Sequence, residues 1–96
     1  MNKIMMLKGG SPAEHKLGNI GRDEDDYIRV WEENEEFFIG AFEEGYGFTD
    51  VNFYKSDVRP LTEDEIAFIN RMWLTINGNV LFKYEVDMNG NVVESK

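Results

Sequence analysis

The chain has no cysteine, one histidine, two prolines and no long run of apolar residues. Without cysteine it can form neither a disulfide nor a thiolate metal site, which is typical of proteins in a reducing compartment. The longest apolar stretch near the N-terminus, residues 4–7, is too short for a signal-peptide core or a membrane span. We therefore expect a cytoplasmic protein that has no contact with membranes, no metal centre and no cofactor.

Positive charge is also scarce, because 10 lysines and arginines stand against 19 aspartates and glutamates, for a formal net charge of −9. Eleven of the carboxylates lie in residues 23–50, where Arg29 is the single base. Such a surface repels nucleic acid and anionic lipid, which excludes direct binding to either. It attracts basic surfaces instead, so the charge indicates a basic macromolecular partner.

A length of 96 residues allows one domain, and 42% hydrophobic and 14% aromatic residues are too many for a disordered acidic tail. Residues 1–22 differ from the rest, since they are rich in glycine and carry a net positive charge. We predict a basic N-terminal strand and arm over 1–22, with a strand at 3–7 and a loop over 9–22. A single α+β domain over 23–96 is expected to follow.

The part that follows Asp26 has the pattern of antiparallel strands. Residues 27–31 predict a strand with Ile28 and Val30 on one face, and residues 32–36 predict an acidic turn around Asn34. Residues 37–42 are apolar on both faces, which predicts a central strand, and Gly40 indicates a bend or a close backbone approach. Residues 48–54 predict a third strand.

A helix is predicted from a capping box at its start, in which Thr62 and Glu65 exchange hydrogen bonds while Leu61 and Ile66 form a hydrophobic staple. The apolar stripe recurs at helical spacing, through Ile66, Ile69, Trp73 and Ile76. Residues 77–78 would end this helix, although residues 73–76 could instead form a strand that turns there. Residues 79–86 and 92–93 predict a C-terminal hairpin around a turn at 87–91.

These elements predict an α+β fold: a small antiparallel sheet or SH3-like partial barrel, with one capped helix packed on it and the C-terminal hairpin. The strand rhythm of residues 27–61, closed by residues 57–61, resembles that of SH3-like barrels. The resemblance covers about a third of the chain, includes no signature motif and implies no function.

No motif indicates catalysis or metal binding. His15 lies in the glycine-rich arm without the positioned partner that acid–base work requires, and the carboxylates are too numerous to single out a hydrolytic pair. Residues 23–26 and 87–91 offer oxygen ligands but lack EF-hand spacing. Residues 18–21 resemble the glycine loop of a KH module, yet no predicted helices flank them. We expect no enzyme, and no catalytic, cofactor-binding or metal-binding residue.

The leading hypothesis is a non-enzymatic interaction protein whose acidic face docks on a basic site of a nucleic-acid-binding protein, in the style of virus-encoded inhibitors and nucleic-acid mimics. The predicted partner-binding residues are Asp25, Asp26, Glu32, Glu33, Glu35, Glu36, Glu43, Glu44, Tyr46 and Asp50. Apolar anchors within this face would come from Phe42, Tyr46, Phe48 and Tyr54, although we expect most of these aromatic residues to be core and Tyr46, between two glycines, to be the best candidate for exposure.

Two alternatives remain open at this stage. One is an SH3-like adaptor that binds a peptide or small ligand through an aromatic groove around Tyr46 and Tyr54. The other is an acidic surface that only interacts with solvent. The sequence indicates no oligomeric state.

Overall fold

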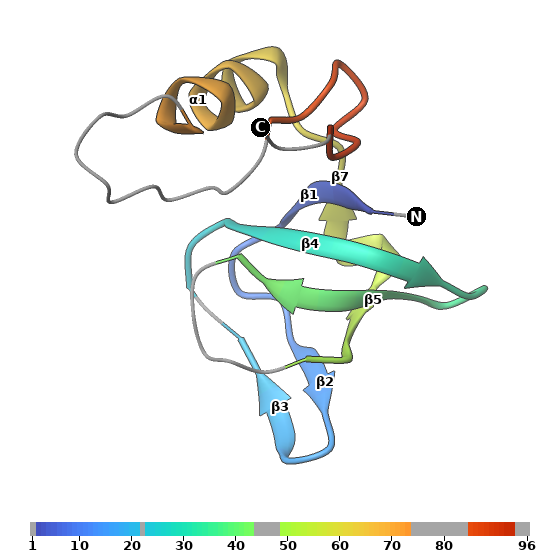
Figure 1. Ribbon diagram of the computed structural model, residues 1–96. Helices are drawn as coiled ribbons and strands as arrows, with labels where there is room; N and C mark the ends of the chain where they lie inside the picture. Colours follow the sequence, from blue (N-terminus) through green and yellow to red (C-terminus); the bar gives the residue numbers. More distant parts are fainter. Residues whose placement is uncertain (1, 22, 44–48, 74–84, 94–96) are drawn as a thin grey trace.

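A computed structural model describes residues 2–21, 23–43, 49–73 and 85–93. Their strands are β1 (Lys3–Leu7), β2 (Ala13–His15), β3 (Gly18–Ile20), β4 (Asp26–Glu33), β5 (Phe37–Phe42), β6 (Val51–Tyr54) and β7 (Val58–Arg59). A short 3₁₀ turn, η1 (Lys55–Asp57), separates β6 from β7, and the helix α1 (Glu63–Trp73) follows. The predicted α+β class is confirmed (Figure 1).

The described strands form one antiparallel sheet in the order β3-β2-β6-β5-β4-β1-β7, and the two end strands do not pair with each other. The sheet is therefore open. β5 is the middle strand, as its apolar residues on both faces predict. The pairs β4–β5 and β5–β6 are hairpins along the chain, whereas β1–β4 and β2–β6 join distant segments.

The prediction of a loop over residues 9–22 is wrong for residues 13–20, which form the hairpin β2–β3. Its glycines serve the turns, because Gly10 and Gly18 have φ angles of +80° and +122°. β2 and β3 are only three residues long, and β2 also pairs with β6, where its partners lie 38 and 40 positions further along the chain. Local composition cannot reveal such a partner.

One face of the sheet carries the main apolar cluster, called here the inner cluster. Its buried members are Met5, Leu7, Ala13, Ile28, Val30, Phe42, Val51 and Phe53. They come from β1, β2, β4, β5 and β6 at alternate positions, as expected when one sheet face is buried. Ile28 and Val30 have no exposed surface, so the predicted inward face of β4 is confirmed. Phe42 is 8% exposed and belongs to this cluster, as expected for most of the aromatic residues considered as anchors, so it is not available as a surface anchor.

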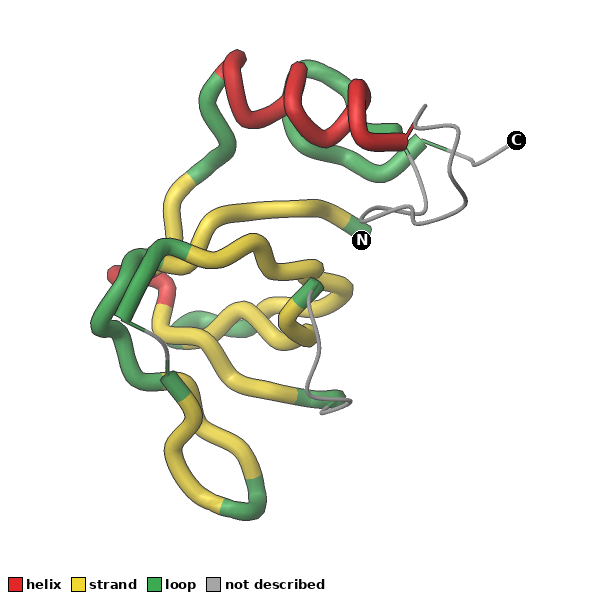
Figure 2. Tube along the Cα trace, turned by 90° about the vertical axis from the view of Figure 1, so that its left-hand side faces the viewer, coloured by secondary structure: helices red, strands yellow, loops and turns green. Residues whose placement is uncertain are grey.

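A second cluster lies between α1 and the other face of β1. Ile4, Ile66, Ile69 and Val86 are buried in it, and Tyr27 packs against it. The Tyr27 and Phe68 rings meet edge to face, with 6.2 Å between their centroids. Figure 2 shows the helix beside β1, at one end of the strand order rather than over the middle of the sheet. The prediction that the helix packs on the sheet is confirmed at this end.

The start of α1 has the predicted capping box. The Thr62 N–H donates to Glu65 Oε1 over 2.8 Å, and the Glu65 N–H donates to Thr62 Oγ1 over 3.2 Å. Arg59 then fixes the helix to β7, because its guanidinium donates to both Glu65 carboxylate oxygens at 2.7 and 2.8 Å. This hydrogen bond is the largest influence that lowers the pKa of Glu65 below its ordinary value. The end of the predicted helix, beyond Trp73, lies outside the described residues.

The C-terminal part is joined to both the helix and β1. Asn70 on α1 accepts from the Val86 N–H over 2.9 Å and donates to its carbonyl over 3.1 Å. The Ile4 N–H donates to the Gly90 carbonyl over 2.8 Å. The predicted turn at 87–91 is present, since the Asp87 N–H donates to the Asn91 carbonyl. Residues 79–84 lie outside the described residues, so the C-terminal hairpin stays a prediction.

β5 lies unusually close to β4 at Gly40. A Cβ added there would lie 1.8 Å from the Arg29 carbonyl oxygen, which is far inside van der Waals contact. The predicted close backbone approach is therefore confirmed. The pairing shifts next to it, from Val30 opposite Gly40 to Glu32 opposite Ile39, which leaves Trp31 as the extra residue of a bulge.

We expect Gly40→Ala to lower the free energy of unfolding by about 3 kcal/mol, because the added methyl group must push two paired backbones apart. The control is Gly10→Ala, which meets no atom within 4 Å and should cost only the roughly 1 kcal/mol of its left-handed backbone. Urea denaturation measures both. Equal losses in the two variants would contradict the close approach.

Glu65→Gln should lower stability by about 1 kcal/mol at neutral pH, since the amide keeps the cap but loses the ion pair with Arg59. The folded-state pKa of Glu65 is lowered, so its contribution is present above the ordinary pKa and disappears as pH falls through the folded value. The difference between wild type and variant in thermal unfolding should thus be largest near neutral pH and shrink as the pH falls below the ordinary carboxyl value. Glu63→Gln, an exposed change in the same helical turn, is the control, and a difference that does not change with pH would contradict the assignment.

Candidate functional site

Four predicted acidic residues gather at the turn between β4 and β5. Asn34 shapes this turn, because its Oδ1 accepts from the N–H groups of Glu36 and Phe37 at 2.9 and 2.8 Å. The Asn34 N–H donates to the Phe37 carbonyl over 3.0 Å, which closes the hairpin. The turn predicted around Asn34 is confirmed. The exposed carboxylates that it presents, called here the acidic tip, are Glu32, Glu33, Glu35 and Glu36.

One lysine partly compensates the charge of the acidic tip. Lys55 Nζ lies 2.7 Å from Glu33 Oε2 and 5.2 Å from the centre of the Phe38 ring. Its backbone N–H also donates to the Glu36 carbonyl over 3.1 Å. Within the described parts of the chain, no ion pair engages Glu32, Glu35 or Glu36. The tip therefore presents a strong local negative potential to solvent.

Three other predicted acids have structural partners. Asp25 accepts from the Gly9 N–H over 2.7 Å and lies 3.6 Å from Arg59. The Glu43 side chain is only 7% exposed and lies 3.6 Å from Arg29 Nε. Asp26 is 8% exposed at the start of β4. These carboxylates hold the chain together, and little of Asp26 or of the Glu43 side chain is left for a partner to touch.

The ten predicted residues do not form one surface. β5 runs from the acidic tip at Phe37 to Phe42, a span of about 17 Å at the usual rise of a strand. Glu43 and Asp50 lie beyond its far end, because Val51 pairs with Gly40 and Tyr54 pairs with Phe37. Residues 49 and 50 were predicted as strand, but β6 begins at Val51 and Asp50 has a φ of 59°. Glu44, Tyr46 and Phe48 lie outside the described residues.

The face of the sheet opposite the inner cluster adds Glu14 and Phe37, which the sequence did not assign to the site, beside Tyr54, which it did. Tyr54 on β6 donates a short hydrogen bond to Glu14 on β2, and its ring lies 4.9 Å from the ring of Phe37, centroid to centroid. The bond to Glu14 is the main cause that raises the pKa of Tyr54 above its ordinary value. Forty residues separate this pair, so no local motif could reveal Glu14.

Trp31 and Glu32 reach the same face through the bulge in β4. Trp31 alternates with Val30, which belongs to the inner cluster, so Trp31 lies on the opposite side. Glu32 is directly opposite Ile39, and residues paired across strands share a face. Without the extra residue, Glu32 would follow simple alternation and lie on the side of Val30. The bulge therefore places Glu32 on the same face as Trp31.

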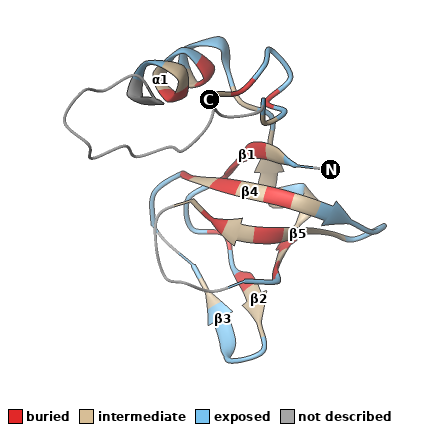
Figure 3. Ribbon diagram, viewed as in Figure 1, coloured by how far each residue is buried: buried red, intermediate tan, exposed pale blue. Residues whose placement is uncertain are grey.

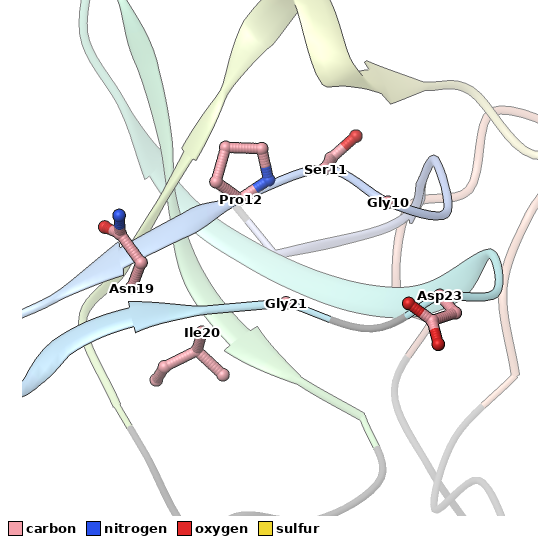
Figure 4. Close-up of a pocket in the computed structure, with 7 residues that line it drawn as sticks. All are labelled: Gly10, Ser11, Pro12, Asn19, Ile20, Gly21 and Asp23. Atoms are coloured by element: carbon pink, nitrogen blue, oxygen red, sulfur yellow. The ribbon is translucent and has the colours of Figure 1, made fainter.

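A pocket of about 280 Å³ opens beside the start of β2 and the end of β3. It is lined by Gly10, Ser11, Pro12, Asn19, Ile20, Gly21 and Asp23. Figure 4 shows the Asn19 amide and the Asp23 carboxylate at opposite ends of the pocket. Ligand sites generally need polar groups that converge, and those of this pocket do not.

The other chemical motifs have structural roles. His15 Nδ1 accepts from the Leu17 N–H over 3.2 Å and so shapes the β2–β3 turn. Asp87 accepts from the N–H groups of Asn89 and Asn91, and the bond to Asn89 is the largest influence that lowers its pKa. Among the described residues, no group of three or more histidine, aspartate or glutamate side chains could hold a metal ion.

No known protein family, curated protein or solved structure matches this chain. Among the described residues, no helix has the length and apolar character needed to cross a membrane.

Glu14→Gln should lower the pKa of Tyr54, because an uncharged amide stabilises the neutral hydroxyl less than a carboxylate does. The tyrosinate absorbance of wild type and variant, each measured against its Tyr54→Phe counterpart, isolates this one titration. An unchanged difference titration would show that Glu14 does not hold the hydroxyl.

Proposed function

We propose that the protein is a non-enzymatic interaction module whose acidic tip docks on a basic site of another macromolecule. The observation that carries the proposal is the exposure of four carboxylates on one hairpin, where Lys55 is the single ion-pair partner among the described residues. Like charges this close repel each other, and binding to a basic surface relieves the repulsion. A domain of 96 residues has a small free energy of unfolding, so the repulsion among these carboxylates lowers its stability noticeably.

The partner that fits this chemistry is a nucleic-acid-binding protein. Its lysines and arginines are already arranged to bind regularly spaced phosphates, and carboxylates offer the same charge and acceptor groups. In this role the protein would compete with nucleic acid for the basic site, as an inhibitor does. The proposal includes the cytoplasmic location that the sequence analysis predicted.

A second candidate is a peptide-binding adaptor with an SH3-like arrangement of its strands. The observation that favours it is the contact between the Phe37 and Tyr54 rings, which lie half-buried on the sheet surface. Binding through such rings depends little on salt, whereas docking through the acidic tip weakens steeply as ionic strength rises. Salt dependence therefore separates the two functions.

The test uses the protein and a quadruple Glu→Gln variant of the acidic tip, each immobilised and exposed to cell lysate at low ionic strength. We expect the wild type to retain nucleic-acid-binding proteins and to release them at about 0.5 M salt, where the Debye length is about 4 Å. Retention of each captured protein by the variant should fall at least tenfold. Added nucleic acid should displace the captured proteins from the wild type.

The matched control neutralises four exposed carboxylates elsewhere, through Asp23→Asn, Glu24→Gln, Glu63→Gln and Asp64→Asn. It removes the same formal charge as the tip variant, so it should bind nearly as well as the wild type if position matters. Equal binding by the wild type and the tip variant would rule out the acidic tip as the docking site.

A further inference from the structure

The middle of the sheet carries apolar side chains on the face that the inner cluster does not use. Trp31 on β4, Phe37 and Ile39 on β5 and Tyr54 on β6 are all half-buried, and they are called here the outer strip. Figure 3 shows how buried and half-buried residues alternate along β4 and β5. Within the described ranges, neither apolar cluster includes any member of the strip.

The strand register brings carboxylates to both sides of the outer strip. Ile39 pairs with Glu32 on one side and with Asn52 on the other, and Asn52 pairs with Glu14. A single row across four strands therefore runs from Glu32 to Glu14, over about 14 Å at the usual strand spacing. Glu36 adds to the negative field at Tyr54, where it helps to raise the tyrosine pKa.

The apolar side chains of the outer strip and the carboxylates beside them together favour a binding partner with positive charge. A second copy of the chain would bring its own −9 and its own acidic tip against the same row, which like-charge repulsion opposes. A purely apolar segment would leave Glu14 and Glu32 beside its non-polar surface without new partners. A basic segment gains from both the rings and the carboxylates.

Arginine fits this surface better than lysine. Its guanidinium is flat, stacks on aromatic faces and donates two parallel hydrogen bonds to one carboxylate. Trp31 and Glu32 are adjacent residues on the same face because of the bulge, and Tyr54 and Glu14 are already in contact. Each side of the strip thus offers an aromatic ring together with a carboxylate.

We infer that the outer strip binds an arginine-bearing segment of the partner protein, with guanidinium groups stacked on Trp31 and Tyr54 and paired with Glu32 and Glu14. The inference rests on the proposed function, since the acidic tip attracts the same basic partner. It adds a contact surface on the sheet and a preference for arginine over lysine.

The probes are fluorescently labelled octa-arginine and octa-lysine peptides, which carry equal charge, titrated with the intact protein and followed by anisotropy. We expect octa-arginine to bind at least fivefold more tightly, on the scale of one or two cation–π contacts. Trp31→Ala should weaken octa-arginine binding five- to tenfold and leave octa-lysine binding nearly unchanged. Tyr54→Phe, which keeps the ring, should bind more tightly than Tyr54→Ala.

Leu17→Ala is the control for a lost apolar side chain, because Leu17 is 75% exposed at the distant β2–β3 turn. It should change neither affinity, and circular dichroism with thermal unfolding should show that each variant folds. Trp31→Phe keeps an aromatic ring at the bulge and should retain most of the arginine preference, which separates stacking from a change of fold.

Each failure has its own pattern. Equal affinity for the two peptides, or no effect of Trp31→Ala and Tyr54→Ala, would overturn the arginine inference, and so would no binding of either peptide. The tip is tested here with Glu33→Gln, Glu35→Gln and Glu36→Gln together, because Glu32 also belongs to the row on the strip. If this triple variant still weakened binding to both peptides, the proposed function would stand without the arginine inference. Binding that needs Trp31 but is unaffected by the triple variant would instead overturn the acidic tip and leave the strip as the binding surface.

Discussion

The backbones of β4 and β5 come so close at Gly40 that a single methyl group there would lie 1.8 Å from the Arg29 carbonyl oxygen. This contact sets the register of the central hairpin, and the bulge at Trp31 begins directly beside it. On one side of the bulge, β4 presents Ile28 and Val30 to the inner cluster. On the other side, it presents Trp31 and Glu32 to the opposite face and ends in the acidic tip. The core and the candidate site thus depend on the same backbone pairing.

The carboxylates of the chain have two different roles in this fold. Asp25, Glu43 and Glu65 have cationic side chains near them, on Arg59 and Arg29, and these pairs hold the segment before β4, the end of β5 and the start of the helix in place. In the ranges that the structure describes, the acidic tip forms an ion pair with Lys55 alone. Arg29 and Arg59 are engaged by the structural carboxylates, so negative charge without an ion-pair partner is left at the hairpin end. This local excess of carboxylates, rather than the net charge alone, is the basis on which we propose a basic partner.

Prediction from the sequence succeeded where short-range physics decides the structure. The capping box at Thr62 and Glu65, the turn at Asn34 and the alternation of Ile28 and Val30 each depend on residues at most three or four positions apart. The central place of β5 followed from its apolar residues on both faces. The β2–β3 hairpin was missed because its strands are short and β2 is held by β6, and the start of β6 was placed too early because Asp50 adopts a left-handed backbone.

The same distinction between local and long-range contacts applies to the candidate site. The sequence by itself determined the charge of the chain, its concentration in residues 23–50 and the exposed turn that carries four of the carboxylates, since composition and turn residues act locally. Only the tertiary structure decided which carboxylates remain available, because Asp26 is buried at the start of β4 and the Glu43 side chain is buried beside Arg29. It also brought Glu14 to Tyr54 across forty residues and turned Glu32 to the face of Trp31. Strand register controls which side chains meet, and register depends on contacts between segments that are far apart in the chain.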